Sequence, residues 1–163
     1  MNDGIRIIIT GGTFDKQYDA VRGELTFRDT HLAEVVANAR INLPVELEVN
    51  QLIDSLHMQD ANRDAVLAAC AKAPESSVIV THGTDTMVQT ASVLGAAKLD
   101  KTIVLTGAMV PYTILGSDAV FNLGAAVAAV QLLPAGVYIA MSGRVFPWDQ
   151  VRKNREKGVF EAI

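Results

Sequence analysis

Two turns rich in threonine and glycine carry the side chains best suited to chemistry. The first is Thr-Gly-Gly-Thr at residues 10–13, and the second is Thr-His-Gly-Thr-Asp-Thr at residues 81–86. Each follows a short run of β-branched apolar residues, a pattern typical of a buried parallel strand. Ligands bind outside the carboxyl ends of such strands, so both turns are predicted to face one crevice. A threonine hydroxyl beside a carboxylate in a shared crevice is the combination expected of an enzyme that uses a hydroxyl as its nucleophile.

The first turn admits other interpretations when it is taken alone. A glycine-rich turn after a first strand is also a common way to bring backbone N–H groups close to a phosphate. Residues 10–13 lack the lysine of a P-loop and the three-glycine spacing of a dinucleotide fingerprint, which disfavours nucleotide binding. Thr13 could equally be a helix cap or an ordinary turn residue.

The second turn favours chemistry more strongly. Thr84 and Asp85 are both residue types that cap helices, so an N-cap is the simple alternative. A helix N-cap does not require His82-Gly83 before these residues, nor a further hydroxyl at Thr86. A carboxylate beside a hydroxyl at a strand end can orient that hydroxyl or bind an ammonium group.

A lysine is the third element, and the chain offers two candidates. Lys101 immediately precedes an expected strand, which places it at the opposite rim as a solvated surface charge. Lys153 follows the last expected strand by about a dozen residues and can fold back over the crevice. A lysine near a carboxylate in a partly dry site can accept or relay a proton, so Lys153 is the expected partner of Asp85.

Alternating strands and helices must position these residues. The expected strands are Ile5 to Thr10, Val45 to Val49, Ser77 to Val80, Thr102 to Thr106 and Val137 to Met141. The expected helices are His31 to Ala39, Asp60 to Ala71, Asp85 to Ala97 and Ser117 to Leu132. This alternation predicts an α/β fold with a doubly wound, mostly parallel sheet in a flavodoxin-like three-layer architecture. Residues 14–30 break the rhythm and are expected to form a lid, with a short hairpin arm at 25–27.

Composition limits the classes of protein and partner. The chain has 163 residues, half of them apolar, and a formal net charge of −4, which disfavours nucleic acid and anionic membrane as partners. Cys70 is the only cysteine, so neither an intramolecular disulfide nor a cysteine-based metal site is expected. Residues 1–4 lack a basic stretch and the apolar run after them is short, so no signal peptide is expected and the cytoplasm is the default location.

Motifs along nearly the whole chain resemble the amino-terminal α/β domain of the bacterial-type L-asparaginase family. The matching segments are 10–13, Asp-Ser-Leu-His-Met at 54–58, the second turn with Met87, Thr-Gly-Ala-Met-Val-Pro at 106–111, Ser-Asp at 117–118, Phe-Asn-Leu at 121–123 and Val-Arg-Lys at 151–153. They occur in the family's order. The resemblance implies an amidohydrolase that converts L-asparagine to L-aspartate and ammonia, with weak glutaminase activity and with no metal or organic cofactor.

The resemblance also implies a role for each matching residue. Thr13 would be the nucleophile that forms an acyl-enzyme, and Tyr18 on the lid would activate or position its hydroxyl. Thr84, Asp85 and Lys153 would form a second set that activates water or assists proton transfer. The implied substrate-binding residues are Ser55 for the α-carboxylate, Asp85 for the α-ammonium, Leu56 in the same segment, and the backbone of Gly12, Gly83 and Ala108 around the amide.

The chain departs from the family pattern in ways that bear on these expectations. Residues 1–163 would form a single-domain type without the family's carboxyl-terminal domain, and so without the acidic group which that domain would bring near Tyr18. Leu56 stands where the common pattern has a polar side chain. A homodimer or homotetramer is expected to complete the crevice walls. The alternative function is a catalytically weak or inactive amino-acid-binding module of the same fold.

Overall fold

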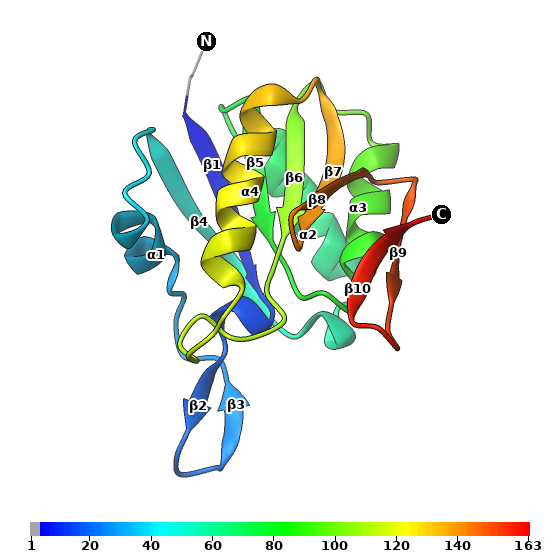
Figure 1. Ribbon diagram of the computed structural model, residues 1–163. Coiled ribbons are helices and arrows are strands. Elements are labelled where there is room, and N and C mark those ends of the chain that lie inside the picture. Colours follow the sequence, from blue (N-terminus) through cyan, green and yellow to red (C-terminus); the bar gives the residue numbers. More distant parts are fainter. Residues whose placement is uncertain (1–3) are drawn as a thin grey trace.

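A six-stranded sheet forms the centre of the molecule, in a computed structural model that describes residues 4–163 (Figure 1). The strand order is β4-β1-β5-β6-β7-β8; every neighbouring pair is parallel except β7–β8. The strands are β1 (Ile5–Gly11), β4 (Val45–Ile53), β5 (Ser77–Thr81), β6 (Thr102–Thr106), β7 (Gly136–Met141) and β8 (Arg144–Pro147). The five parallel strands have the order 2-1-3-4-5 in chain sequence, which confirms the predicted flavodoxin-like sheet.

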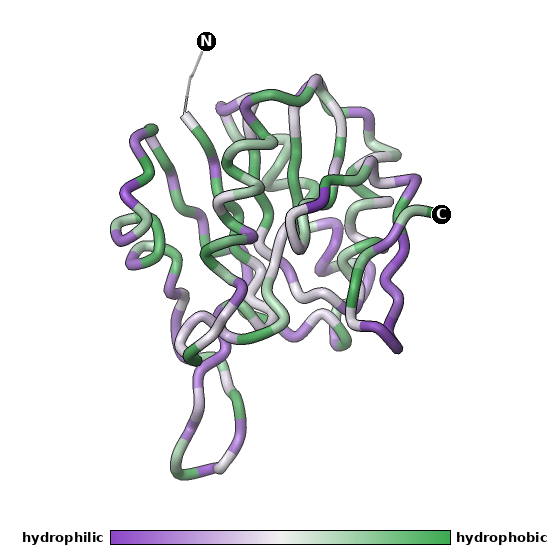
Figure 2. Tube along the Cα trace, in the orientation of Figure 1, coloured by the Kyte–Doolittle hydropathy of each residue, from purple (hydrophilic) through white to green (hydrophobic). Residues whose placement is uncertain are grey.

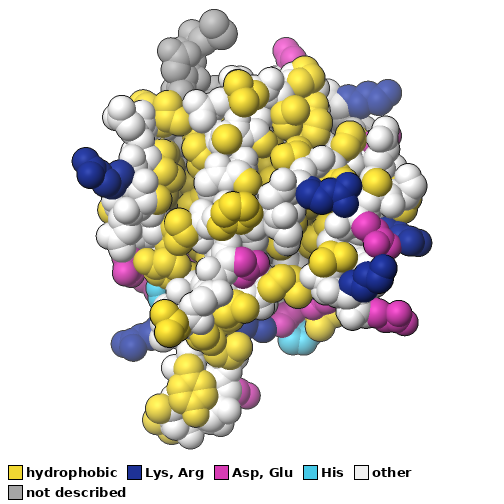
Figure 3. Space-filling model, in the orientation of Figure 1, with side chains coloured by type: hydrophobic (Ala, Val, Ile, Leu, Met, Phe, Trp, Pro, Cys, Tyr) yellow, Lys and Arg dark blue, Asp and Glu magenta, His cyan; other side chains and the backbone are white. Residues whose placement is uncertain are grey.

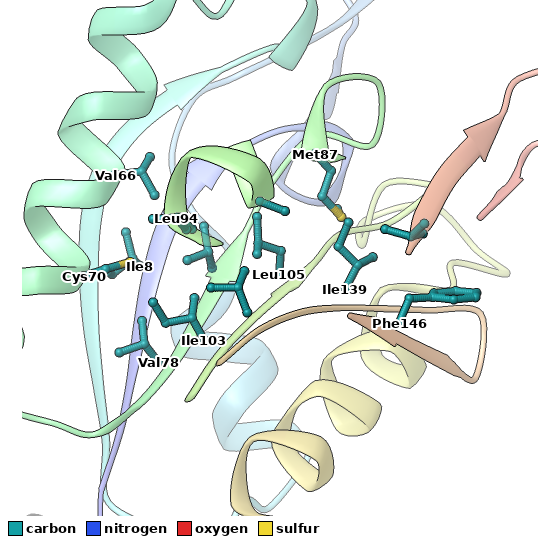
Figure 4. Packing of buried hydrophobic residues seen from close by; sticks show 14 of the residues in the cluster. Ile8, Val66, Cys70, Val78, Met87, Leu94, Ile103, Leu105, Ile139 and Phe146 are labelled. Carbon is teal, nitrogen blue, oxygen red and sulfur yellow. The ribbon is translucent and has the colours of Figure 1, made fainter. Parts of the chain in front are cut away.

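Helices cover both faces of this sheet, which confirms the predicted three layers. Helices α1 (Leu32–Asn38) and α4 (Ala119–Leu132) pack on one face, and α2 (Asp60–Lys72) and α3 (Met87–Ala96) pack on the other. The side chains of each strand alternate between the two cores. Ile8 points to the core under α2 and α3, where Val66 and Leu94 meet it (Figure 4), whereas Ile7 and Ile9 belong to the core under α1 and α4.

Helices α3 and α4 begin two residues later than predicted, because hydrogen bonds to serine side chains hold the residues of the expected first turn outside the helix. The expected start of α3 at Asp85 is wrong: the helix begins at Met87, since Thr86 N–H donates to Ser55 Oγ (3.2 Å) and its hydroxyl donates to Ser55 O (2.8 Å). Helix α4 begins at Ala119 rather than at Ser117, whose hydroxyl oxygen accepts from the Ala119 N–H. Asp85 therefore lies in a turn and not in a helix.

Two hairpins leave the sheet near its carboxyl-terminal edge (Figure 1). The first is formed by β2 (Gln17–Asp19) and β3 (Glu24–Thr26) and projects from the body, so the expected arm at 25–27 is the second strand of a longer hairpin. The second is formed by β9 (Val151–Asn154) and β10 (Val159–Ala162), and the hydrophilic colours of Figure 2 dominate the turn between these strands. The sequence patterns did not indicate this second hairpin or β8.

The opposite edge of the sheet is held by buried and half-buried charges. Lys101 lies at this edge as predicted, but the expectation of a solvated charge is wrong. Its Nζ donates to the carbonyl oxygens of Ala73 (2.5 Å) and Glu75 (2.7 Å), just beyond the end of α2. The Glu75 carboxylate is bound by the Arg6 guanidinium, whose Nε lies 3.0 Å from Oε2. This edge is therefore held by structural contacts, and the other edge carries the two threonine-rich turns that were predicted to border a crevice.

Within residues 4–163, no helix has the length and apolar character needed to cross a bilayer. The expectation about a signal peptide depends on the first residues of the chain, of which 1–3 lie outside the described part.

Candidate active site

The two threonine-rich turns meet at the point where the strand order reverses. Strand β1 is flanked by β4 on one side and by β5 on the other, so its carboxyl end and that of β5 are neighbours. Gly11 and Gly12 have φ values of 96° and 69°, which favour glycine, and lead the chain away from the sheet into Thr13. Gly12 lies directly against the backbone of Gly83. The structure thus brings together the first and second turns, which the sequence predicted to share a crevice.

The hairpin of β9 and β10 delivers Lys153 to the second turn. Lys153 Nζ donates to Thr84 Oγ1 at 2.8 Å and to Asp85 Oδ1 at 2.9 Å. The lysine side chain is only 11% exposed, the aspartate side chain is 33% exposed, and Thr84 is buried. The Lys153 ammonium thus binds both the Thr84 hydroxyl and Oδ1 of Asp85. The other carboxylate oxygen, Asp85 Oδ2, makes no protein hydrogen bond within the described residues. The arrangement can pass protons along its length and present an anionic oxygen to a ligand.

Neither Thr13 nor Thr84 is the N-cap of a helix. Thr13 is the first residue of the short 3-10 helix η1 (Thr13–Asp15), whose N-cap is Gly12, and the N-cap of α3 is Thr86. Thr13 is half-buried, and its hydroxyl has no hydrogen-bond partner anywhere in residues 4–163. A hydroxyl that is accessible and unengaged beside the crevice is available to attack a ligand.

Tyr18 is not brought to Thr13. It lies on β2 of the projecting hairpin and is 63% exposed (Figure 1). In the described part of the chain, no hydrogen bond joins the two side chains. The expected role of Tyr18 in activating Thr13 stays a prediction, and it requires the hairpin to fold toward the crevice.

The predicted substrate-binding segment around Ser55 lies beside the second turn. Ser55 begins the 3-10 helix η2 (Ser55–His57) at the end of β4, is 1% exposed, and packs its side chain against Gly83. Its Oγ already accepts from the Thr86 N–H, so this serine fixes the second turn as well as lying near the crevice. Leu56 is 57% exposed and presents an apolar side chain at the rim.

The loop between β6 and α4 forms a further wall, which contains Ala108. A β-carbon on Gly107 would lie 2.3 Å from His82 O, so this loop approaches the second turn as closely as backbones allow. Asp118 accepts from the N–H groups of Met109 and Val110 (2.9–3.0 Å), and the fully buried Asn122 donates to Gly107 O at 2.9 Å. Ala108 is buried, so only backbone groups of this loop can serve a ligand at that position.

His82 orients the second turn and is not placed to act as an acid or base. It is completely buried, and burial lowers its pKa from 6.5 to about 4. Its Nδ1 lies 2.7 Å from Gly83 O, which can only accept, so Nδ1 carries the proton and Nε2 accepts from the Thr90 hydroxyl at 2.7 Å. A neutral imidazole with both nitrogens engaged has a structural role.

Sequence reasoning missed two charged residues at this edge. Asp15 is fully buried two residues after Thr13; it accepts from the Thr30 hydroxyl (3.0 and 3.1 Å) and from the His31 N–H (2.8 Å). Burial raises the pKa of the Asp15 carboxyl. Arg155 donates from Nη2 to Asp85 O at 3.0 Å. Neither residue belongs to a motif, and their partners lie 15 to 70 positions away, so no local signal could have revealed them.

Within residues 4–163, no group of three or more His, Cys, Asp or Glu side chains could hold a metal ion. Cys70 lies on the buried face of α2, and burial raises the pKa of its thiol to about 12. The polar groups around the two turns include hydroxyls, the Asp85 carboxylate, the Lys153 ammonium, the Arg155 guanidinium and backbone amides, a set that suits covalent acyl transfer.

Comparisons with known proteins found a matching family model and similar chains. The family model described as "Asparaginase, N-terminal" matches residues 4–161. L-asparaginase 2 of Escherichia coli (strain K12) is 31% identical over 166 residues, which cover 95% of this chain and 47% of that protein. Glutaminase-asparaginase of Acinetobacter glutaminasificans is 42% identical over 82 residues, which cover 48% of this chain and 25% of that protein.

Solved structures of similar proteins share the fold. A probable cytoplasmic L-asparaginase from Campylobacter jejuni superposes with a TM-score of 0.85 at 30% identity, covering 98% of this chain and 53% of that one. The thermostable L-asparaginase from Thermococcus kodakarensis gives a TM-score of 0.84 at 25% identity, with coverages of 98% and 51%. The chain spans about half the length of these structures.

Proposed function

We propose, from the premise that this chain belongs to the asparaginase family and corresponds to its amino-terminal domain, that it hydrolyses the side-chain amide of L-asparagine. The products are L-aspartate and ammonia, and glutamine is a weaker substrate. The observation that carries the proposal is the bonding of Lys153 to both Thr84 and Asp85, beside a turn that holds an unengaged Thr13 hydroxyl.

Thr13 is the nucleophile in this proposal. Its Oγ1 attacks the amide carbon and gives up its proton, and the amide nitrogen is protonated as the C–N bond breaks and ammonia leaves. Water then attacks the resulting ester, which releases aspartate and returns the proton to Thr13. Thr84 and Lys153 move these protons, because a threonine hydroxyl needs a neighbouring base or a shared proton network.

The remaining crevice groups bind the substrate. Asp85 Oδ2, which has no protein hydrogen bond in the described residues, accepts from the α-ammonium, and the Ser55 segment meets the α-carboxylate. Backbone groups of Gly12, Gly83 and Ala108 surround the amide. A backbone donor aimed at the developing oxyanion is typically worth roughly 3–4 kcal/mol, so a rigid turn matters here.

Two substitutions test the assignment. We expect Thr13→Ala and Thr84→Val each to abolish ammonia release from L-asparagine in a coupled assay while circular dichroism stays unchanged. Ser76→Ala is the control, because this exposed serine immediately precedes β5 at the opposite edge of the sheet and should keep full turnover. Retained turnover in both crevice variants would defeat the proposal.

A second candidate function is a binding module that keeps the crevice without turnover. The exposed position of Tyr18, away from Thr13, and the apolar Leu56 at the rim support it. Calorimetric titration with L-aspartate beside the ammonia assay separates the two functions, since binding without hydrolysis identifies the module.

We further propose that the protein is a cytoplasmic homodimer or homotetramer. The relative from Campylobacter jejuni is described as probably cytoplasmic. On α4, Phe121 is 65% exposed and Leu132 is 84% exposed, and apolar side chains lie over this helix in Figure 3. Light scattering coupled to gel filtration tests the assembly, and a monomer at micromolar concentration would contradict it.

A further inference from the structure

Arg155 is a second cation on the carboxylate of Asp85. Its Nη2 donates to the Asp85 backbone oxygen at 3.0 Å, and its Nη1 lies 3.8 Å from Asp85 Oδ1. That same Oδ1 accepts from Lys153 Nζ at 2.9 Å. One carboxylate therefore faces two cations before any ligand is present.

The neighbouring arginine on the same hairpin is arranged differently. Arg152 binds Glu161 through Nε (2.9 Å) and Nη2 (2.8 Å), so a carboxylate of the hairpin itself balances its charge. Within residues 4–163, Asp85 is the only carboxylate within 4.0 Å of Arg155. Lys153, Arg155 and Asp85 together leave one positive charge in surplus, and all three line a small cavity. Arg152 lines the same cavity, but Glu161 balances its charge.

This surplus bears on the two groups attached to the α-carbon of an amino-acid substrate. An ammonium at Asp85 Oδ2 becomes the third cation around a single carboxylate, and Arg155 repels it. A carboxylate in the same region is attracted, and the guanidinium still has N–H donors free to bind it. The Arg155 side chain is 59% exposed, so water screens both effects and the expected change in selectivity is about fivefold.

We propose that Arg155 is a specificity-determining residue that holds Asp85 in place and shifts selectivity toward side-chain amides with a carboxylate but no α-ammonium. The proposal rests on the amidohydrolase function and names a feature of its substrate class. Succinamate, which is asparagine without the α-amino group, is the simplest member of this class.

The test compares kcat/KM for succinamate and for L-asparagine, measured by ammonia release, in four proteins. These are the wild type, Arg155→Ala, Arg155→Lys and the matched control Arg152→Ala. The ratio of succinamate to asparagine is expected to fall about fivefold in Arg155→Ala, and to stay within twofold of the wild type in Arg155→Lys and Arg152→Ala. The expected fall has two parts, a higher KM for succinamate and a lower KM for asparagine, which a merely structural loss would not produce.

Other outcomes overturn the inference or the function separately. An unchanged ratio in Arg155→Ala, or an equal change in Arg152→Ala, overturns the role of Arg155 while leaving the amidohydrolase in place. If the wild type hydrolyses neither amide, the proposed function fails, and calorimetric titration with succinate and L-aspartate then decides on Arg155. A ratio of dissociation constants that shifts about fivefold in Arg155→Ala supports the inference, and an unchanged ratio or no binding overturns it.

Discussion

Gly12 lies so close to Gly83 that a β-carbon on Gly12 would come within 2.4 Å of the Gly83 amide nitrogen and 2.5 Å of its Cα. The atoms in the way belong to backbone, which cannot swing aside as a flexible side chain can. Two chain segments about 70 residues apart are thereby held in contact, one ending at Thr13 and the other continuing to Thr84. Their distance from each other depends on the absence of one methyl group.

Gly12→Ala is therefore expected to destabilise the protein by more than its backbone conformation alone requires. Gly23→Ala is the comparison, because Gly23 has nearly the same φ (68° against 69°) but nothing within 4 Å of an added β-carbon. Gly12 also has ψ −175°, a conformation essentially restricted to glycine, so backbone strain adds to the contact with Gly83. We expect a loss of about 1 kcal/mol for Gly23→Ala and roughly 3 kcal/mol or more for Gly12→Ala in urea unfolding. Equal losses would show that the contact with Gly83 is not limiting.

Lys153→Met is expected to disable the second hydroxyl set while leaving the fold in place. The change removes the donor to Thr84 Oγ1 and Asp85 Oδ1, and a positioned proton carrier typically contributes a factor of about 10²–10⁴ in rate. We expect kcat for L-asparagine to fall in that range. Lys157→Met, on the exposed turn of the same hairpin, should behave as wild type; a comparable loss in both variants would indicate a general effect on the hairpin.

The stability of the fold should fall in mild acid because of His82. Its pKa is lowered from 6.5 to about 4, so the contribution of the neutral imidazole is fully present above about pH 6.5 and is lost as the pH falls toward 4. Linkage gives a loss of about 2 kcal/mol from this residue between pH 7 and pH 5. His82→Asn keeps a donor toward Gly83 O but does not titrate there.

The measurement is the free energy of urea unfolding at pH 7 and pH 5 for both proteins. We expect His82→Asn to be less stable than wild type at pH 7 and to lose about 2 kcal/mol less between the two pH values. The same loss in both proteins would assign the acid sensitivity to other groups.

Asp15 is expected to tie down the base of the β2–β3 hairpin. The side chain joins the segment entering the hairpin to Thr30 and His31 on the segment leaving it. Asp15→Ala leaves the half-buried His31 N–H without its acceptor, at a cost toward the lower end of the roughly 1–3 kcal/mol of an unsatisfied buried donor. Tryptic cleavage after Arg22 and Arg28 should become several-fold faster.

Asp29→Ala provides the comparison for this prediction. Asp29 is exposed and, among residues 4–163, accepts only from the adjacent Thr30 N–H, so its removal should leave the cleavage rate within twofold of wild type. If Asp15→Ala is cleaved no faster than Asp29→Ala, the hairpin is held by other contacts, such as the salt bridge between Lys16 and Asp54 at 2.6 Å.

The amino-acid sequence by itself determined the five parallel strands of the central sheet and the two threonine-rich turns that follow β1 and β5. Short runs of β-branched apolar residues, such as residues 5–9 and 78–80, favour a buried strand, and the glycines that follow them indicate where the chain turns. The choice of Lys153 over Lys101 also followed from chain order, because each lysine's position relative to a strand fixes its edge of the sheet. These features depend on neighbours within a few residues, which a single sequence displays.

Only the tertiary structure decided which polar groups meet at the crevice. Arg155 reaches Asp85, and Asp15 reaches Thr30 and His31, through the exact course of two hairpins that no local pattern encodes. The late start of α3 likewise depends on Ser55, which competes for the Thr86 N–H from another strand end. Such contacts arise when the packed sheet fixes segments that are remote in sequence, so their partners are selected by three-dimensional distance rather than by spacing along the chain.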